Sequence, residues 1–165
     1  MAFHIREATL DDLPAIDGIF RAHLVVGETH AWDAGISSEV MRSIWFEPGR
    51  ATFVLIEGSQ ISAAYCIKPN QPFRGSHVAN GNYVVAQNKC GRGLGTYIAL
   101  DSLDRARSFG YVAIQFNAVV ATNIAAIRLW QKCGFQTVGR IPGGFAHPRF
   151  GLVDLLIMYR SLPTL

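Results

Sequence analysis

The sequence predicts a mixed α/β (α+β) fold in which a central, mostly antiparallel sheet is flanked by helices. Two β-rich runs, 52–56 and 61–67, are separated by Gly58-Ser59-Gln60, which is typical of a hairpin. Further on, residues 77–116 read as a strand, a glycine-rich turn, a helix and another strand. Since 165 residues, 50% of them hydrophobic, can bury one substantial core, we expect a single domain over residues 1–165.

The N-terminal part reads as a strand followed by two helices. Residues 4–8 form a short strand, and Thr9 with Asp12 makes a capping-box pattern ahead of a helix that continues through Phe20. Residues 28–33 are irregular. A second helix is expected around 40–46, and Pro48-Gly49 ends it.

The C-terminal part reads as alternating strands and helices. A strand over 77–85 leads into the glycine turn, a helix runs from about 93 to 109, and Gly110 stops it before a strand at 111–116. A further helix is expected from about 122 to 132, with strands near 135–138 and 152–159. Residues 143–148 are either a flexible loop beside the substrate or an ordinary hairpin connection.

Charge and composition exclude several functions. Fifteen basic and 12 acidic residues give a net charge of +3 without any long run of one sign, which is too mild to predict nucleic-acid binding. Charged residues lie where a secretory signal would begin its apolar part, and no uncharged run approaches the ~18 residues of a membrane span. Cys66, Cys90 and Cys133 lack metal-site spacing, and Cys66 and Cys133 read as core thiols. We therefore expect a cytoplasmic protein with no metal, membrane or nucleic-acid partner.

A glycine-rich turn at residues 90–95, Cys-Gly-Arg-Gly-Leu-Gly, is the clearest candidate site. Alternating glycines let the backbone approach a ligand closely, and the free N–H groups of the following helix can bind an anion. The side chains of Arg92 and Thr96 could add hydrogen bonds. The P-loop pattern is excluded because no lysine follows Gly95, and the dinucleotide pattern G-x-G-x-x-G fails at Thr96. Alone, the turn predicts either a pyrophosphate site or merely a tight turn.

The second half of the chain favours the pyrophosphate site. Residues 123–135, Asn-Ile-Ala-Ala-Ile-Arg-Leu-Trp-Gln-Lys-Cys-Gly-Phe, resemble the N-x-x-A-x-x-L-Y-x-K-x-G-F signature of the GNAT superfamily of acyl-CoA-dependent N-acetyltransferases. Residues 90–95 are similar to that family's [RQ]-x-x-G-x-[GA] motif, and the resemblance extends over nearly the whole chain. It implies the GNAT fold, with acetyl-CoA entering between two splayed strands that end at Val85 and Asn117.

This resemblance also implies roles for individual residues. The backbone of Val84 and Val85 is expected to pair with the pantetheine amides of acetyl-CoA, and the turn to hold the pyrophosphate. Asn123 is expected beside the pantetheine arm, although a helix N-cap accounts for it equally well and is compatible with that role. The expected cofactor-binding residues are Val84, Val85, Cys90, Gly91, Arg92, Gly93, Leu94, Gly95, Thr96, Asn123, Ala126 and Trp130.

Two of these residues depart from the family pattern. Cys90 replaces the usual arginine or glutamine, which removes a side-chain contact and leaves the backbone cradle. Trp130 stands where many members have a tyrosine that protonates the leaving CoA thiolate, and an indole N–H cannot act as that acid. Either the thiolate leaves without a dedicated acid, since a thiol has a pKa of about 8.5, or another group such as a bound water serves, or the protein binds acetyl-CoA without turnover.

A closer resemblance, within residues 65–80 and 116–132, is to the fungal azetidine-2-carboxylate (proline-analogue) N-acetyltransferase subgroup, which also has this tryptophan. It implies direct acetyl transfer to a small-molecule amine, an amino acid or a toxic analogue. Asn80 and Asn117 would be the catalytic and substrate-binding residues, with Tyr83 at a substrate-facing position. Amide side chains suit this task because they donate and accept without adding charge.

Several alternatives remain beside this interpretation. Asn80-Gly81 is also a favoured turn dipeptide, whereas asparagine is depleted in buried strands, which favours a functional Asn117. His77 is a candidate general base, although a lone histidine more often has a structural role. The alternative functions are acetylation of a protein or peptide α-amine, which needs an open groove, and an acetyl-CoA-binding module without turnover. A homodimer is compatible with the sequence.

Overall fold

The computed structural model describes residues 3–163, and its centre is a seven-stranded sheet in the order β1-β2-β3-β4-β5-β7-β6. Every neighbouring pair is antiparallel except β4 and β5, which are parallel, so the predicted fold class is confirmed. The strands are β1 (Phe3–Glu7), β2 (Ala51–Glu57), β3 (Gln60–Pro69), β4 (Val78–Val85), β5 (Ala113–Val120), β6 (Gln136–His147) and β7 (Gly151–Ser161).

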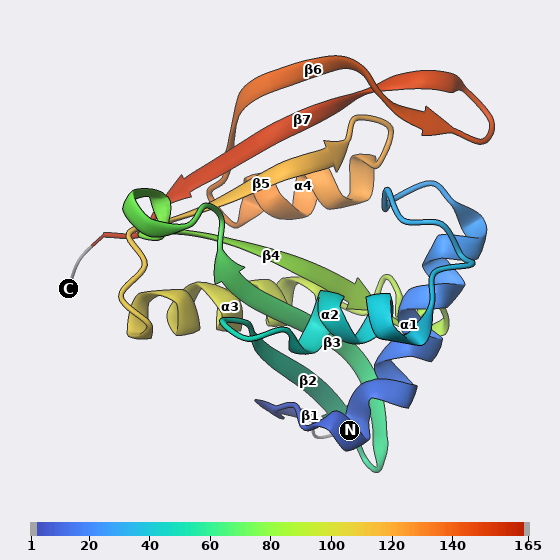
Figure 1. Cartoon of the computed structure of the whole chain (residues 1–165), viewed down its shortest axis with the longest axis vertical. Helices are drawn as coiled ribbons and strands as arrows, with labels where there is room; N and C mark the ends of the chain where they lie inside the picture. The colour runs from blue at the N-terminus through green and yellow to red at the C-terminus, as the bar shows by residue number, and fades with distance from the viewer. Residues whose placement is uncertain (1–2, 164–165) are drawn as a thin grey trace.

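Helices cover both faces of the sheet (Figure 1). One core joins α1 (Leu13–Val26) and α2 (Ser38–Phe46) to Val54, Ala64 and Val84, and the other joins α3 (Leu94–Ser108) and α4 (Ile124–Lys132) to Phe53 and Tyr65. Successive residues of β2 and β3 thus enter opposite cores, as strand geometry requires. Cys66 and Cys133 are buried thiols, as predicted. Short 3₁₀ turns lie at Leu10–Asp12, Phe73–Gly75 and Gln87–Lys89.

The start of α1 follows the predicted capping box. The Thr9 backbone N–H donates to Asp12 Oδ2 at 2.8 Å, and the Asp12 carboxylate also pairs with Arg6 at 2.7 Å. Gly27 ends the helix with φ of +71°, a conformation that glycine adopts without steric cost. Gly27 therefore sets the residue at which α1 ends and the segment 27–37 begins.

The sheet opens between β4 and β5 (Figure 1). In the described part of the chain the two strands pair only at Val78–Ala113 and Ala79–Ile114, and they then diverge. The predicted splay is present, but the expectation that the second strand ends at Asn117 is wrong. β5 continues to Val120, because a register shift between Phe116 and Val119 accommodates Asn117 as an irregularity inside the strand.

The C-terminal hairpin corrects a second expectation. Residues 143–147 belong to β6, and only 148–150 form the turn into β7, so the flexible-loop interpretation is wrong and the hairpin alternative is closer. Gly143, with φ of +59°, lies at a register shift that bends the strand. Arg149 in the turn pairs with Glu28 at 2.8 Å, which joins the hairpin to the segment after α1.

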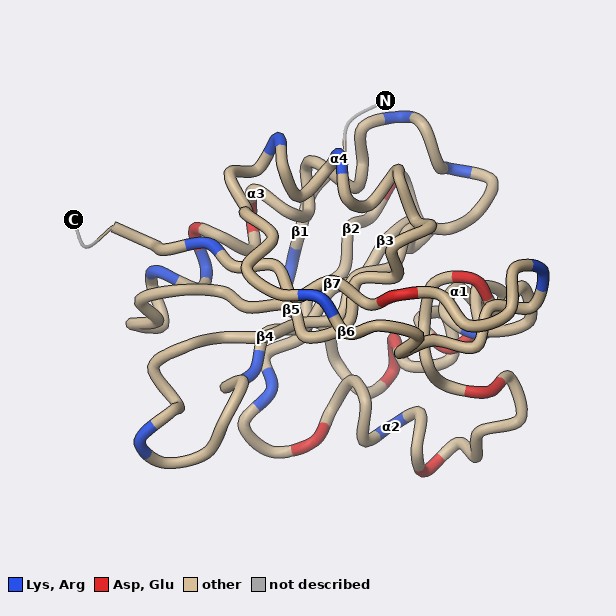
Figure 2. Tube along the Cα trace, turned by 90° about the horizontal axis from the view of Figure 1, so that it is seen from above, with Lys and Arg blue, Asp and Glu red and all other residues tan. Residues whose placement is uncertain are grey.

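Charged residues are distributed over many elements. Figure 2 shows basic residues on several separate segments, interrupted by acidic ones. Among residues 3–163, no helix combines the length and apolar character needed to cross a membrane.

Candidate active site

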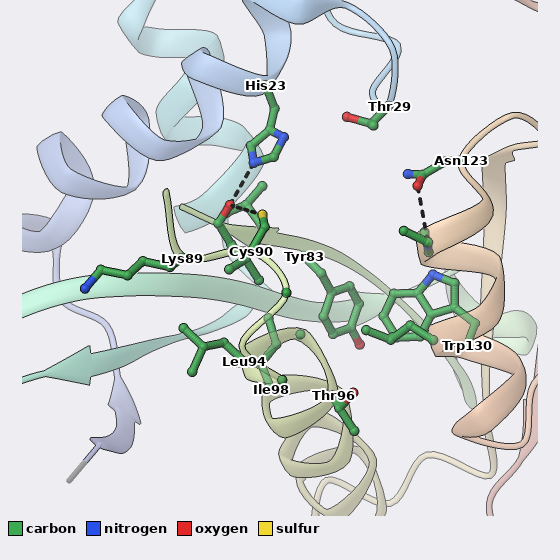
Figure 3. Close-up of a pocket in the computed structure, with 18 of the residues that line it drawn as sticks. His23, Thr29, Tyr83, Lys89, Cys90, Leu94, Thr96, Ile98, Asn123 and Trp130 are labelled. Carbon is green, nitrogen blue, oxygen red and sulfur yellow. Dashed lines mark hydrogen bonds between the residues drawn. The ribbon is translucent and has the colours of Figure 1, made fainter. Parts of the chain in front are cut away.

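Two adjoining cavities lie at the opening of the sheet. The first, here called the turn cavity, has a volume of about 380 Å³ and lies beside the glycine turn (Figure 3). The second, the amide cavity, has a volume of about 270 Å³ and lies beside Asn80 and Asn117. Six residues line both cavities: Thr29, His30, Tyr83, Asn123, Ala126 and Trp130.

The glycine turn leaves an open cradle at the N-terminus of α3. Gly91 and Gly93 have φ of +77° and +81°, and a Cβ at either position would meet no protein atom within 4 Å. A Cβ on Gly95 would lie 2.8 Å from Leu129 Cδ1, so this glycine permits close packing of α3 against α4. The first intrahelical bond runs from Tyr97 N to Gly93 O, which leaves earlier N–H groups without a helical acceptor. The turn therefore presents the positive end of the helix dipole to an anion.

Arg92 anchors the turn instead of facing the turn cavity. Its guanidinium pairs with Glu57 at 2.8 Å, Lys89 approaches the same carboxylate at 3.3 Å, and Ser62 donates to it at 2.8 Å. The hydrogen bond from Ser62, followed by those from Arg92 and Lys89, lowers the pKa of Glu57 to about 2. A buried carboxylate at the end of β2 thus fixes both sides of the turn.

The free edge of β4 continues the cradle. Val84 is buried, and the Val85 carbonyl accepts a hydrogen bond from His23 Nε2 at 2.8 Å (Figure 3). Cys90 is exposed, with Sγ 3.6 Å from the Ala86 carbonyl oxygen. Asn123 caps α4 by accepting from Ala126 N at 3.2 Å, so its N-cap interpretation is confirmed. The predicted residues that line this cavity are Val84, Val85, Cys90, Gly91, Gly93, Leu94, Gly95, Thr96, Asn123, Ala126 and Trp130.

An aromatic cluster forms the wall between the two cavities. The Trp130 ring lies 4.8 Å from Tyr83 and 4.4 Å from Phe116 between centroids. The Tyr83 hydroxyl donates to Ser102 Oγ on α3 at 2.9 Å, and burial raises its pKa. Tyr83 therefore lines both cavities while its hydroxyl is held by α3, and its substrate-facing role stays a prediction. Trp130, which the sequence resemblance aligns with a tyrosine of many family members, is buried in this wall.

The two predicted asparagines meet at a third one. Asn70 Oδ1 accepts from Asn80 Nδ2 at 3.1 Å and from Asn117 Nδ2 at 2.7 Å. Asn80 Oδ1 accepts from Gly81 N at 2.7 Å, and Asn117 Oδ1 accepts from Gln115 Nε2 at 2.8 Å. Within the described residues 3–163, each of the two amides keeps one N–H that has no acceptor. Because Asn80 lies inside β4, the turn interpretation of Asn80-Gly81 is wrong.

The segment after α1 covers the amide cavity, and sequence reasoning missed its role. Thr29, His30 and Trp32 line the cavity, and Thr29 Oγ1 lies 2.9 Å from His30 Nδ1. Burial, with a smaller effect of His23, lowers the pKa of His30 to about 4, so its imidazole is neutral at physiological pH. The available signal was a run of polar and aromatic residues in a segment without helical or strand periodicity.

Lys68 is a second residue that sequence reasoning missed. It stands opposite Asn80 in the register of β3 and β4, and it lines the amide cavity. Partial burial lowers its pKa, and no carboxylate within residues 3–163 forms an ion pair with it. His77, the predicted candidate base, is exposed and lines neither cavity.

These features define a class of protein. The open edge of β4 leads to the N-terminus of α3, and this arrangement suits an elongated ligand whose amides pair with the strand and whose pyrophosphate lies at the helix. The amide cavity adjoins the β4 end of this binding surface. The arrangement is that of a transferase that uses a CoA thioester.

Comparison with known proteins identifies the family. Residues 19–135 match the model of the Acetyltransferase (GNAT) family. The chain is 35% identical over 119 residues, 72% of its length, to N-acetyltransferase aca1 of Schizosaccharomyces pombe, of which the match spans 57%. It is 30% identical over 175 residues, 99% of the chain and 98% of the relative, to the L-methionine sulfoximine/L-methionine sulfone acetyltransferase of Pseudomonas paraeruginosa. A GCN5-related N-acetyltransferase from Kribbella flavida has a TM-score of 0.92 at 39% identity, with 98% of each chain covered.

The chain therefore belongs to the GNAT acetyltransferase family. The predicted GNAT fold and N-acetyltransferase class are confirmed, and the family's acyl donor is acetyl-CoA. The cradle suits this donor, because the open faces of Gly91 and Gly93 admit a pyrophosphate and the free β4 edge can pair with the pantetheine amides.

Proposed function

We propose that this enzyme transfers the acetyl group of acetyl-CoA directly to the amine of a small amino acid or amino-acid analogue. The amide cavity carries the proposal. Its volume of about 270 Å³ is at the small end for small-molecule sites, and residues 29–32 cover it. It adjoins the turn cavity through six shared residues, so an amine bound there lies next to the thioester.

The donors of this cavity suit a carboxylate. Asn80, Asn117 and Lys68 line one cavity, each carries N–H donors, and none of the three side chains supplies a negative charge. A carboxylate accepts several hydrogen bonds and gains from a nearby cation. The amine of an amino acid bound in this way is left to face the cofactor side.

Catalysis in this proposal rests mainly on alignment. When bound, acetyl-CoA supplies an electrophilic thioester carbonyl. The β4 edge and Asn123 would hold the pantetheine arm, while Asn80, Asn117 and Lys68 hold the amine in line for attack. Trp130, Tyr83 and Phe116 exclude water from the junction. Placing two reactants in attack geometry can supply a large part of a rate enhancement.

One relative supports this substrate class. The Pseudomonas paraeruginosa protein, aligned over 98% of its length, acts on L-methionine sulfoximine and L-methionine sulfone, which are amino-acid analogues. The S. pombe relative is an N-acetyltransferase whose length this chain matches only over 57%.

A substrate panel tests the proposal. Acetyl-CoA is incubated with the enzyme and single amines, including amino acids, methionine sulfoximine, azetidine-2-carboxylate and short peptides, and CoA release is followed with a thiol reagent. Release that depends on free amino acids or their analogues supports the proposal. Turnover of peptides alone would indicate peptide α-amine acetylation. Tight acetyl-CoA binding without turnover of any amine would indicate a non-catalytic acetyl-CoA-binding module, the alternative suggested by Trp130 in place of the usual tyrosine.

We also propose that residues 1–165 form one domain, that the protein acts in the cytoplasm and that it associates as a homodimer. The C-terminal hairpin exposes several apolar side chains, which supports a self-association surface. They are Val138, Ile141, Phe150 and Leu152, exposed by 58%, 43%, 63% and 75%. Sedimentation equilibrium tests the homodimer, and a monomer at micromolar protein concentration would contradict it.

A further inference from the structure

A proton-transfer group at the junction of the two cavities would serve both the amine and the leaving thiolate. The attacking amine must lose a proton, the leaving sulfur must gain one, and Trp130 cannot supply it. Among the six residues that line both cavities, only His30 and Tyr83 can exchange a proton in the ordinary range. The Tyr83 hydroxyl already donates to Ser102 Oγ, and its pKa is raised by burial. His30 is the remaining group.

The surroundings of His30 fix its ring. The imidazole packs edge-to-face against Phe20, with 4.9 Å between centroids, and His23 lies 6.1 Å away. On the side of Thr29, Nδ1 lies 2.9 Å from the hydroxyl oxygen. When Nδ1 is protonated and donates a hydrogen bond to Thr29 Oγ1, Nε2 has a free lone pair. The hydrogen bond of one ring nitrogen decides the role of the other.

We propose that His30 relays the proton of the acetyl transfer, from the attacking amine to the departing thiolate, and that Thr29 positions its ring. This inference rests on the proposed amino-acid N-acetylation. The neutral amine forms the new C–N bond, and its proton passes to His30 Nε2. The C–S bond breaks with its electron pair on sulfur, and His30 returns the proton to that sulfur. The products are an N-acetyl amine and the CoA thiol, and His30 is neutral again.

The charge environment favours such a relay. The neighbouring groups on the packed elements are His23 on α1, the Tyr83 backbone carbonyl on β4 and the Thr29 hydroxyl, and none of them is a carboxylate. Burial, with a smaller effect of His23, lowers the pKa of His30 and disfavours a lasting imidazolium, while the Tyr83 carbonyl acts in the opposite direction. A ring that takes a proton there gives it up readily, and a thiolate is the more basic acceptor.

His30→Gln tests the relay, since glutamine fills space and forms hydrogen bonds but does not carry a proton. We expect kcat to fall about 100-fold or more, with the acetyl-CoA Kd from calorimetry and the melting temperature nearly unchanged. His77→Gln is the matched control, because His77 is exposed and lines neither cavity, and its kcat should stay that of the wild type. A His30→Gln enzyme with wild-type kcat would overturn the relay. The proposed acetyl transfer would still stand, because it is measured separately on the wild-type enzyme.

Chemical rescue separates proton transfer from packing. In His30→Ala, added imidazole should restore part of the turnover, whereas pyrazole, which has the same size but is a much weaker base, should not. Equal rescue by both would assign a packing role to His30. Thr29→Val should lower kcat less than His30→Gln does, and Thr29→Ser should restore it.

A spectroscopic readout is independent of turnover. In ¹⁵N spectra of histidine-labelled enzyme, the His30 signals should show protonated Nδ1 and a free Nε2 lone pair at neutral pH, and they should shift when acetyl-CoA is added. If Nε2 of His30 is protonated both with and without acetyl-CoA, the relay is contradicted. This result does not depend on which amine is the substrate, so it separates the relay from the proposed function.

Discussion

At the scale of single residues, the amide cavity depends on one oxygen atom, Asn70 Oδ1, that accepts hydrogen bonds from two side chains. This leaves one amide N–H on Asn80 and one on Asn117 without a partner among residues 3–163. The sequence indicated Asn80 and Asn117 through a family resemblance, but Asn70, which directly follows β3 in a proline-containing loop, had no predicted role. Its role appears only when the register of β3 and β4 and the irregularity in β5 bring the three amides together.

Asn117→Ala tests this residue-scale account. The change removes one donor to the substrate and one to Asn70, and each lost hydrogen bond costs about 1 kcal/mol or more in such a site. We expect kcat/KM for the amine to fall about 10-fold to 100-fold, with the acetyl-CoA Kd changed less than about twofold. Steady-state kinetics and calorimetry measure the two quantities. Equal losses in both would show that Asn117 is not on the substrate side.

At the scale of elements, the glycine turn was predictable because its signal is local, whereas the orientation of Arg92 was not. Glycines before a helix define a cradle from a few consecutive residues. The guanidinium of Arg92, however, is captured by Glu57, which is 35 positions away in sequence and is buried at the end of β2. Pairings of this kind depend on tertiary packing and leave no periodic pattern.

Gly93→Ala tests the cradle, with Gly110→Ala as its control at the other end of α3. Both glycines have left-handed φ, +81° and +83°, and both have open space where a Cβ would lie. Each change should therefore lower the free energy of unfolding by a similar amount, about 1 kcal/mol. Only Gly93→Ala should weaken acetyl-CoA binding, by about tenfold, measured by calorimetry. Equal weakening in both variants would contradict the cradle.

The cap of α1 makes a prediction about pH. A hydrogen-bonded pair with Arg6, assisted by the Thr9 N–H, lowers the pKa of Asp12 from 3.8 to about 2. A lowered folded-state pKa stabilises the protein above the unfolded value, and this stabilisation is lost as pH falls from about 4 to about 2. Asp12→Asn should lower the free energy of unfolding in urea by about 1 kcal/mol at pH 7, after allowance for solvent screening, and by almost nothing near pH 2.

Asp104→Asn is the control for this prediction. Its carboxylate pairs with Arg107 at 2.7 Å, but the side chain is 80% exposed, and exposed pairs contribute little. The unfolding curves of this variant should match those of the wild type at both pH values. A difference between Asp12→Asn and wild type that persists undiminished at pH 2 would show that the ion pair does not stabilise the cap.

At the scale of the whole molecule, the site is assembled where the sheet opens, from segments distant in sequence. β4 supplies the edge and Asn80, β5 supplies Asn117, α3 and α4 supply their N-termini, and residues 29–32 line the amide cavity. The β2–β3 hairpin and the glycine turn could be predicted from the sequence because periodicity and turn residues specify them, whereas the splay was expected only from the family resemblance. His30 and Lys68 could not, because one lies in a segment without periodicity and the other looks like any half-exposed strand lysine.

The most direct test compares one free amino acid, accepted in the substrate panel, with its primary amide and with a dipeptide that begins with the same residue. The measurement is kcat/KM for acetyl transfer, with the acetylated product identified by mass. We expect the free acid to exceed both others by about 100-fold, and Lys68→Gln to reduce that difference, because the cavity recognises a carboxylate. Equal or greater kcat/KM for the dipeptide would contradict a small amino-acid substrate.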